Sequence, residues 1–171
     1  MDIRINVEPT DAHQSIKFML DRHFNKTMEK CANCSTINEQ SNYLWVLPDI
    51  VIIKPHREPH YKNLPIDYPL QDLNLAQYLH PESPDNDKKI ITLYSLYGIV
   101  IHIGETNITG HFISHVKSVE SPKVIWNRYD DNKVTQLKLN DVKDSTAFIL
   151  FYARNGLKNL VDLKQEKRLN V

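Results

Sequence analysis

The sequence has 171 residues, and its 21 Lys and Arg balance 21 Asp and Glu, so it lacks the positive charge typical of proteins that bind nucleic acid or anionic membranes. A hydrophobic content of 41% is enough for the core of one domain, or for one part of a larger domain. No apolar run approaches the ~18 residues that cross a bilayer, and Met1 is followed by Asp2 and Arg4, unlike a secretory signal. We therefore expect a protein of the cytoplasm, the nucleus or both, with neither a nucleic acid nor a membrane as its partner.

The first third of the chain predicts strands around one helix. Residues 3–7 alternate apolar and polar side chains, which is typical of a half-buried strand. Apolar residues recur at helical spacing over residues 16–24 and predict an amphipathic helix. The apolar run 43–53 predicts two strands separated by Pro48, the second of them buried on both faces.

The rest of the chain predicts an antiparallel sheet. Residues 55–89 are rich in proline and polar residues, which indicates loops with one short helical turn at 75–79. Runs rich in β-branched and aromatic residues predict strands at 90–103, 111–119, 124–129, 134–139 and 147–153. The fold class is therefore α+β with an antiparallel sheet, followed by a charged tail at 156–171.

Glycine is rare in this chain, and its use points to one histidine. Three of the four glycines, Gly98, Gly104 and Gly110, lead up to His111, and glycine marks places where the backbone turns sharply or is closely approached. If residues 111–119 and 124–129 form a hairpin, paired residue numbers sum to roughly 241 to 243. His111 then lies beside Asp130, Asp131 or Asn132.

A carboxylate beside a histidine fixes its tautomer and stabilises its protonated form, which suits a general base. The same arrangement also occurs as an ordinary surface pair, so geometry alone leaves both interpretations open. His111 and His115 have the spacing of a metal chelate on a helix, but on a strand they are ~13 Å apart and cannot share an ion.

Several segments resemble the ubiquitin-specific proteases, in order and at compatible spacing. The histidine box of that family is similar to YSLYGIVIHIGETNITGHFISHV, WNRYDDNKV and AFILFYAR, at residues 94–116, 126–134 and 147–154. Upstream, residues 15–58 are similar to the family's stretch from a small helix through Cys-x-x-C and Leu-Pro to the strand that returns into the palm. The segment IDYPLQDLNLAQYL also matches, so the resemblance covers about residues 1–155.

The resemblance implies a papain-like cysteine protease fold, with an antiparallel palm and fingers-like strands and without the N-terminal helical thumb. Residues 1–155 would be part of the catalytic domain, with a fingers remnant at 1–48 and the palm at 49–155. The implied activity is deubiquitination, the thiol-dependent hydrolysis of peptide and isopeptide bonds at the C-terminus of ubiquitin. Ubiquitin and ubiquitinated proteins are the implied partners.

The resemblance also assigns site residues. His111 would be the general base, Asp130 the residue that orients it and Asp131 a supporting polar residue. The stretch from Gly104 to Gly110 would flank the channel for the C-terminal tail of ubiquitin. Three aromatic residues near this stretch are further candidates for the channel, although aromatic residues at the last two positions are more often core: Phe112, Trp126 and Tyr129.

The family's nucleophilic cysteine belongs to a box N-terminal to the segments matched here. By the same resemblance, Cys31 and Cys34 correspond to half of a structural zinc site, and the missing second pair favours the alternative of two free or weakly metallated thiols. No cofactor is expected for catalysis. We therefore expect the chain to be inactive alone. Two alternatives are an inactive module that binds ubiquitin or serves as a scaffold, and an unrelated β-rich binding protein with a chance His–Asp pair.

Overall fold

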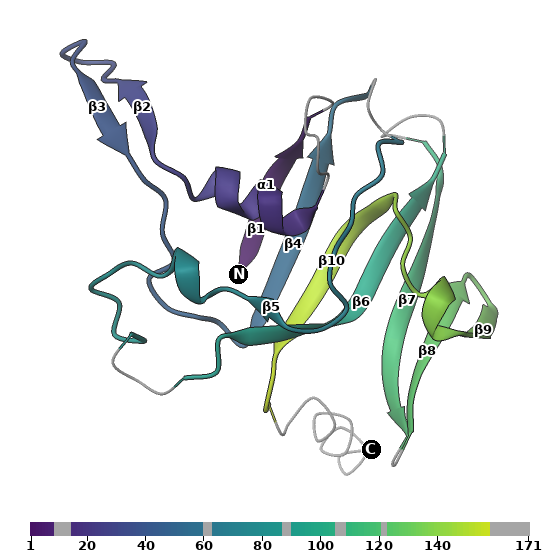
Figure 1. The fold of residues 1–171 in the computed structure, drawn as a ribbon. Coiled ribbons are helices and arrows are strands. Elements are labelled where there is room, and N and C mark those ends of the chain that lie inside the picture. Colours follow the sequence, from purple (N-terminus) through teal and green to yellow (C-terminus); the bar gives the residue numbers. More distant parts are fainter. Residues whose placement is uncertain (9–14, 60–62, 87–89, 105–108, 121–122, 158–171) are drawn as a thin grey trace, which may run out of the picture.

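The fold is a large twisted sheet with a small two-stranded sheet beside it (Figure 1). The structure, a computed structural model, describes residues 1–8, 15–59, 63–86, 90–104, 109–120 and 123–157. The strands are β1 (Asp2–Val7), β2 (Thr27–Lys30), β3 (Ile37–Gln40), β4 (Ile50–Arg57), β5 (Leu73–Asn74), β6 (Leu93–Ile103), β7 (His111–Glu120), β8 (Lys123–Asp130), β9 (Lys133–Leu137) and β10 (Ala147–Arg154). The described helices are α1 (Ile16–His23) and the 3-10 helices Ala76–Tyr78 and Leu139–Asp141.

The large sheet runs in the order β1-β4-β10-β6-β7-β8-β9, with β5 paired to β6. The expectation of a purely antiparallel sheet is wrong at one edge, because β1 pairs with β4 in parallel. The chain between these two strands passes through α1, and a connection of this kind returns the second strand in the direction of the first. The remaining pairs of the sheet are antiparallel, as predicted.

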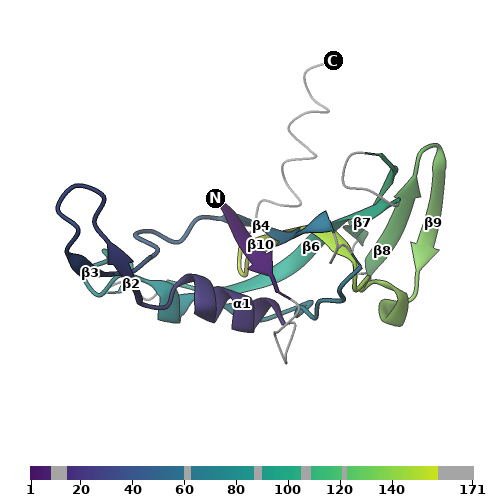
Figure 2. The ribbon, with the colours of Figure 1, turned by 90° about the horizontal axis from the view of Figure 1, so that it is seen from above.

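One face of the sheet is covered and forms the core. Alternate residues of β1 and β4 are buried, and α1 buries Ile16, Met19 and Leu20 on this side of the sheet (Figure 2). The side chain of Ser15 caps the helix by accepting a hydrogen bond from the backbone N–H of Phe18 at 3.2 Å.

The predicted central place of the strand at Ile50–Ile53 is confirmed, because β4 has a strand on each side. The expectation that it is buried on both faces is wrong, because Val51 and Ile53 are buried whereas Ile50 and Ile52 are only partly buried.

Strands β2 and β3 form a separate hairpin that projects from the rest of the molecule (Figure 1). All eight of its residues are exposed. Within the segment 1–48 that was expected to be a fingers remnant, β1 instead belongs to the large sheet and only β2 and β3 stand apart. Residues 158–171 of the expected charged tail lie outside the described residues.

The strand expected at residues 43–47 does not form. Leu44 makes a single bridge to Leu79, and the next backbone groups are bound by side chains instead. Ser83 Oγ donates to the carbonyl oxygen of Trp45 at 2.7 Å, and Asp85 Oδ2 accepts from the N–H of Leu47 at 2.8 Å.

The predicted helical turn within 75–79 is confirmed. Among the described residues, no helix has the length and apolar character needed to cross a membrane.

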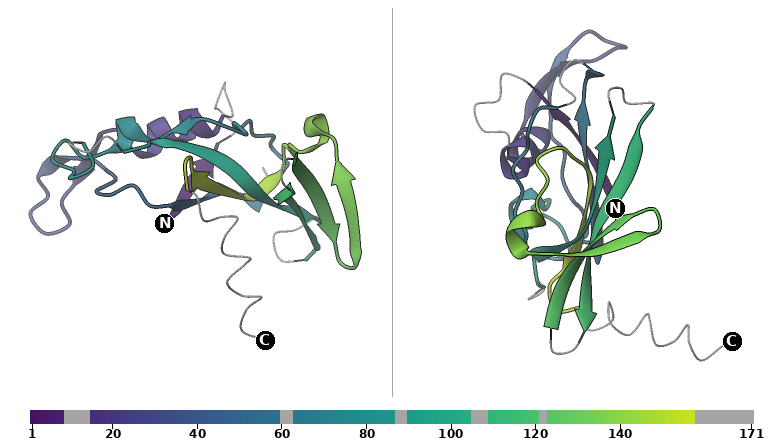
Figure 3. Two further views of the ribbon diagram at one scale, coloured as in Figure 1. Left: turned by 90° about the horizontal axis from the view of Figure 1, so that it is seen from below. Right: turned by 90° about the vertical axis from the view of Figure 1, so that its right-hand side faces the viewer.

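Strands β7 and β8 form the predicted hairpin, with Glu120 opposite Lys123 and paired residue numbers that sum to 243. The twist of the sheet turns β8 and β9 away from the β1 and β4 edge, as the two views of Figure 3 show. This hairpin and β6 carry the candidate site.

Candidate active site

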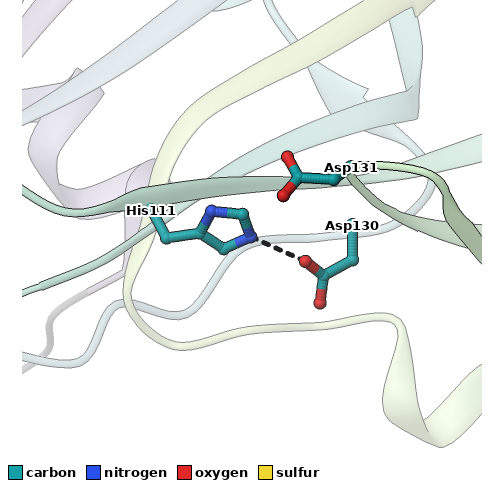
Figure 4. Close-up of side chains that lie close together, drawn as sticks. All are labelled: His111, Asp130 and Asp131. Carbon is teal, nitrogen blue, oxygen red and sulfur yellow. Dashed lines mark hydrogen bonds and ion pairs between the residues drawn. The ribbon is translucent and has the colours of Figure 1, made fainter.

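His111 and Asp130 lie side by side because they occupy neighbouring strand ends. His111 is the first residue of β7, and Asp130 is the last residue of β8. In an antiparallel pair the start of one strand meets the end of the next, and both side chains point to the same face of the sheet. Nε2 of His111 is 2.6 Å from Oδ1 of Asp130 (Figure 4). The predicted juxtaposition is therefore confirmed.

The pair is open to solvent. The His111 side chain is 43% exposed and that of Asp130 is 33% exposed. Asp131 follows in the turn before β9 with a φ of 50°, a left-handed conformation that aspartate tolerates. Its carboxylate lies near the pair, since the three side chains each have a ligand atom within 4.8 Å of the others, close enough to hold a metal ion.

The electrostatics favour a protonated imidazole. The hydrogen bond that His111 donates to Asp130 raises the pKa of His111, the nearby charges of Asp131 and Asp130 raise it further, and the charge of Arg128 lowers it. The pKa of Asp130 is lowered, first by the hydrogen bond from His111 and then by that from Arg128. Because Nε2 is held by Asp130, Nδ1 is the nitrogen that can exchange a proton with a reacting group.

Arg128 is a site residue that sequence reasoning missed. Its Nη2 donates to Oδ2 of Asp130 at 3.0 Å, so the two oxygens of one carboxylate have different partners. The available signal was the spacing of two residues between Arg128 and Asp130, which puts both side chains on one face of a strand.

The glycines before His111 occupy places of close backbone approach. A Cβ added at Gly110 would lie 2.3 Å from Nε2 of His102 and 2.5 Å from the carbonyl oxygen of Ile103. A Cβ at Gly104 would lie 2.5 Å from the carbonyl oxygen of Thr109. The prediction of close approach is confirmed for Gly104 and Gly110 but is wrong for Gly98, where an added Cβ would meet Phe151 at an ordinary 3.5 Å. The role of Gly104 and Gly110 in a ubiquitin channel stays a prediction. Residues 105–108 of the proposed channel loop lie outside the described residues.

The three aromatic candidates differ in exposure. Phe112 is 52% exposed and its ring stacks on the buried His102, with centroids 4.4 Å apart. Tyr129 is 38% exposed and lies opposite Ser114 in the hairpin. Trp126 is only 7% exposed and belongs to the hydrophobic core, which agrees with the expectation that an aromatic residue at this position is more often core. An indole ring of this size is placed on the covered face of β8 because burial of its apolar surface is favourable.

Cys31 and Cys34 lie in the turn between β2 and β3, on the hairpin that projects away from the β7–β8 hairpin (Figure 1). Sγ of Cys34 lies 3.2 Å from Oγ1 of Thr36. Hydrogen bonds with the side chain and then the backbone of Thr36, and with Cys31, stabilise the thiolate and lower the pKa of Cys34 to about 7. Within the described part of the chain, no group of three metal-ligating side chains includes either cysteine. The pair offers two of the four ligands that a structural zinc needs, so zinc binding stays a prediction.

Comparison with known proteins agrees with this architecture. The family model described as ubiquitin carboxyl-terminal hydrolase matches residues 2–152. Ubiquitin carboxyl-terminal hydrolase 5 of Arabidopsis thaliana is 26% identical over 134 residues, which cover 74% of this chain and 14% of that protein. Ubiquitin carboxyl-terminal hydrolase 21 of the same plant is 40% identical over 91 residues, which cover 53% of this chain and 12% of that protein.

Solved structures show the same fold. One structure of the SAGA Ubp8/Sgf11/Sus1/Sgf73 DUB module has a TM-score of 0.65 and 23% identity, over 90% of this chain and 33% of that chain. A second structure, of the same module bound to ubiquitin aldehyde, has a TM-score of 0.64 and 21% identity, over 90% of this chain and 36% of that chain.

The sheet with its helix α1 is thus the sheet-dominated part of a papain-like catalytic fold, as the sequence predicted. The chain belongs to the ubiquitin carboxyl-terminal hydrolase family. It spans 14% and 12% of the length of the two curated relatives, and about a third of the solved chains.

Proposed function

We propose that this chain supplies the histidine and the aspartate of a cysteine-type deubiquitinase, which hydrolyses the peptide or isopeptide bond at the C-terminus of ubiquitin. The observation that carries the proposal is the hydrogen bond between His111 and Asp130 at a solvent-exposed edge, in a chain of this family. The ubiquitin aldehyde bound in one of the similar structures supports ubiquitin as the partner.

In this mechanism His111 moves protons through Nδ1, because Asp130 holds Nε2. Nδ1 takes the proton of a thiol, and the sulfur attacks the carbonyl carbon of the bond that follows ubiquitin's terminal glycine. The imidazolium returns that proton to the departing amine as the carbon–nitrogen bond breaks, which leaves ubiquitin as a thioester. Nδ1 then takes a proton from water as its oxygen attacks the thioester, and returns this proton to the departing thiolate.

Asp130 stabilises the imidazolium that forms twice in this cycle, and the charge of Asp131 adds to that effect. Every proton transfer uses a side chain, so the proposed chemistry needs no cofactor. The exposed ring of Phe112, Tyr129 and the glycines at 104 and 110 are proposed to line the path of ubiquitin's extended tail.

The thiol has to come from elsewhere than the two cysteines of this sequence. Cys31 and Cys34 lie on the β2–β3 hairpin, which projects from the molecule away from the β7–β8 hairpin (Figure 1). This observation also favours the second candidate function, a module that binds ubiquitin without turnover.

Ubiquitin binding by the chain itself tests the part that both functions share. Isotope-labelled chain is titrated with ubiquitin and followed by backbone NMR. We expect shifts confined to 98–104, 109–115 and 126–133, and we expect ubiquitin without its C-terminal tail to produce weaker shifts. Absence of any shift with intact ubiquitin would contradict both functions.

Turnover separates the two candidates. The native protein that contains this chain is assayed with ubiquitin carrying a fluorophore on its C-terminus, and is compared with its His111→Ala variant. The enzyme interpretation expects hydrolysis that the substitution reduces by about 10³-fold or more. Ubiquitin binding without hydrolysis by the native protein would instead establish the binding module.

A further inference from the structure

The carboxylate of Asp130 is held at both oxygens. His111 Nε2 lies 2.6 Å from Oδ1, and Arg128 Nη2 donates to Oδ2 at 3.0 Å. A carboxyl group on a single side-chain torsion can turn so that neither oxygen points at a given neighbour. A donor on Oδ2 restricts this rotation and therefore keeps Oδ1 directed at the imidazole.

The backbone makes this contact a consequence of strand geometry. Arg128 and Asp130 are two residues apart on β8, so both side chains lie on the face of the sheet that also carries His111. In register, Arg128 lies between His115 of β7 and Thr135 of β9, which confines the start of its side chain on both sides. The Arg128 side chain is 39% exposed, and its guanidinium reaches along the strand to the carboxylate.

The charge of Arg128 has a second effect. The imidazole of His111 faces the carboxylates of Asp130 and Asp131, and both favour its protonated form. Arg128 opposes them. The other neighbours in register are Ile103 of β6, which is apolar and opposite His111, and Lys133 of β9, which is opposite Asp130. A general base must be neutral before it accepts a proton. The charge of Arg128 favours the neutral imidazole and so partly offsets the effect of the two carboxylates.

We propose that Arg128 is a positioning residue of the site: its guanidinium fixes the carboxylate of Asp130 toward His111 and balances the negative charge around the imidazole. This inference rests on the proposed function, in which His111 and Asp130 act as base and orienting residue. Arg128 acts through Asp130 and touches no reacting atom.

The titration of His111 tests the proposal without any turnover. Imidazole NMR signals of the chain are followed against pH in the wild type, in Arg128→Met, in Arg128→Lys and in Lys133→Met. If Arg128 positions Asp130, Arg128→Met frees the carboxylate and weakens the hydrogen bond that raises the pKa of His111 most, so we expect the titration midpoint of His111 to move downward although an opposing cation is lost. An upward shift would show that the guanidinium acts by its charge alone and would overturn the positioning role. Arg128→Lys should return the midpoint most of the way toward the wild type, since it keeps a cationic donor.

Lys133→Met is the matched control, because it removes a cation in register with Asp130 while Arg128 keeps its contact with the carboxylate. This variant should leave the midpoint of His111 nearly unchanged. An unchanged midpoint in Arg128→Met, with backbone spectra showing an intact sheet, would overturn the proposal. So would equal shifts in Arg128→Met and Lys133→Met.

In the native protein that contains this chain, Arg128→Met should lower kcat by about 10-fold to 100-fold with little change in KM. Arg128→Lys should recover part of this loss. A downward-shifted titration in a native protein without turnover would leave the role of Arg128 standing and reject the enzyme. Turnover that depends on His111 and Asp130 but not on Arg128 would support the enzyme and reject the positioning role of Arg128.

Discussion

His111 and Asp130 are 19 residues apart in the chain, and their side chains meet at 2.6 Å across the β7–β8 hairpin. The hairpin register places the two residues beside each other, because each occupies the end of its strand. A shift of one residue in this register would move one side chain to the other face of the sheet. The short connection between Glu120 and Lys123 is therefore what brings the pair together.

The pair should stabilise the fold in a defined pH window. The pKa of His111 is raised in the folded chain, so its contribution is present below the unfolded pKa of ~6.5 and is lost as the pH rises through the folded pKa. The pKa of Asp130 is lowered, so its contribution is present above the unfolded value of ~3.9 and is lost as the pH falls through the folded pKa. Asp130→Asn should therefore reduce the urea midpoint most near pH ~5.5 and least near pH ~9.

The control for this experiment is Asp67→Asn, which removes a carboxylate that Lys143 contacts at 2.8 Å. Lysine stays charged over this range, so the effect of Asp67→Asn should vary little between the two pH values. Equal losses at both pH values in Asp130→Asn would show that the carboxylate does not interact with the imidazolium.

Core and channel roles of the hairpin aromatics can be separated by substitution. Trp126 is 7% exposed, so Trp126→Ala should cost about 3–5 kcal/mol of folding free energy by leaving a cavity. Tyr129 is 38% exposed, so Tyr129→Ala should cost about 1 kcal/mol or less and mainly weaken ubiquitin binding. Urea denaturation and ubiquitin titration measure the two effects. Comparable destabilisation by both substitutions would contradict this division of roles.

The local features of the sheet were predictable from the sequence, and the long-range ones were not. A short turn between two alternating runs fixes an antiparallel register, which is why His111 could be placed next to Asp130 or its neighbours. The parallel pairing of β1 with β4 depends on a connection through α1 of more than forty residues, which no local pattern records.

Other features depend on individual side chains. The run around Trp45 is apolar enough for a strand, but Ser83 and Asp85 bind the backbone groups that a strand would pair. The contact of Arg128 with Asp130 depends on a side-chain conformation within one strand. The contacts of Ser83 and Asp85 leave no periodic signal in the sequence. The spacing of Arg128 and Asp130 indicates a shared strand face but does not show that their side chains meet.

The thiol of Cys34 should react as an acidic cysteine. Its pKa is lowered to about 7, first by the hydrogen bond with Thr36. The rate at which iodoacetamide alkylates Cys34 in the wild-type chain, followed by mass spectrometry of the peptide that contains it, should therefore rise with a midpoint near pH ~7. Thr36→Val should move that midpoint upward, toward the ordinary thiol value of ~8.5. A midpoint that does not respond to Thr36→Val would show that the hydroxyl has no such effect.

A side chain at Gly110, directly before His111, should destabilise the fold. A Cβ there would lie 2.5 Å from the carbonyl oxygen of Ile103, which is backbone of β6 and cannot move without disturbing the sheet. Gly110→Ala should cost about 1–3 kcal/mol and shift the signals of His102 and His111. Gly98→Ala is the matched control, because its Cβ would meet Phe151 at an ordinary 3.5 Å and should cost less than about 1 kcal/mol. Since Gly110 directly precedes the proposed base, Gly110→Ala should also reduce turnover in the native protein. Equal stability and activity of Gly110→Ala and Gly98→Ala would refute a steric role for Gly110.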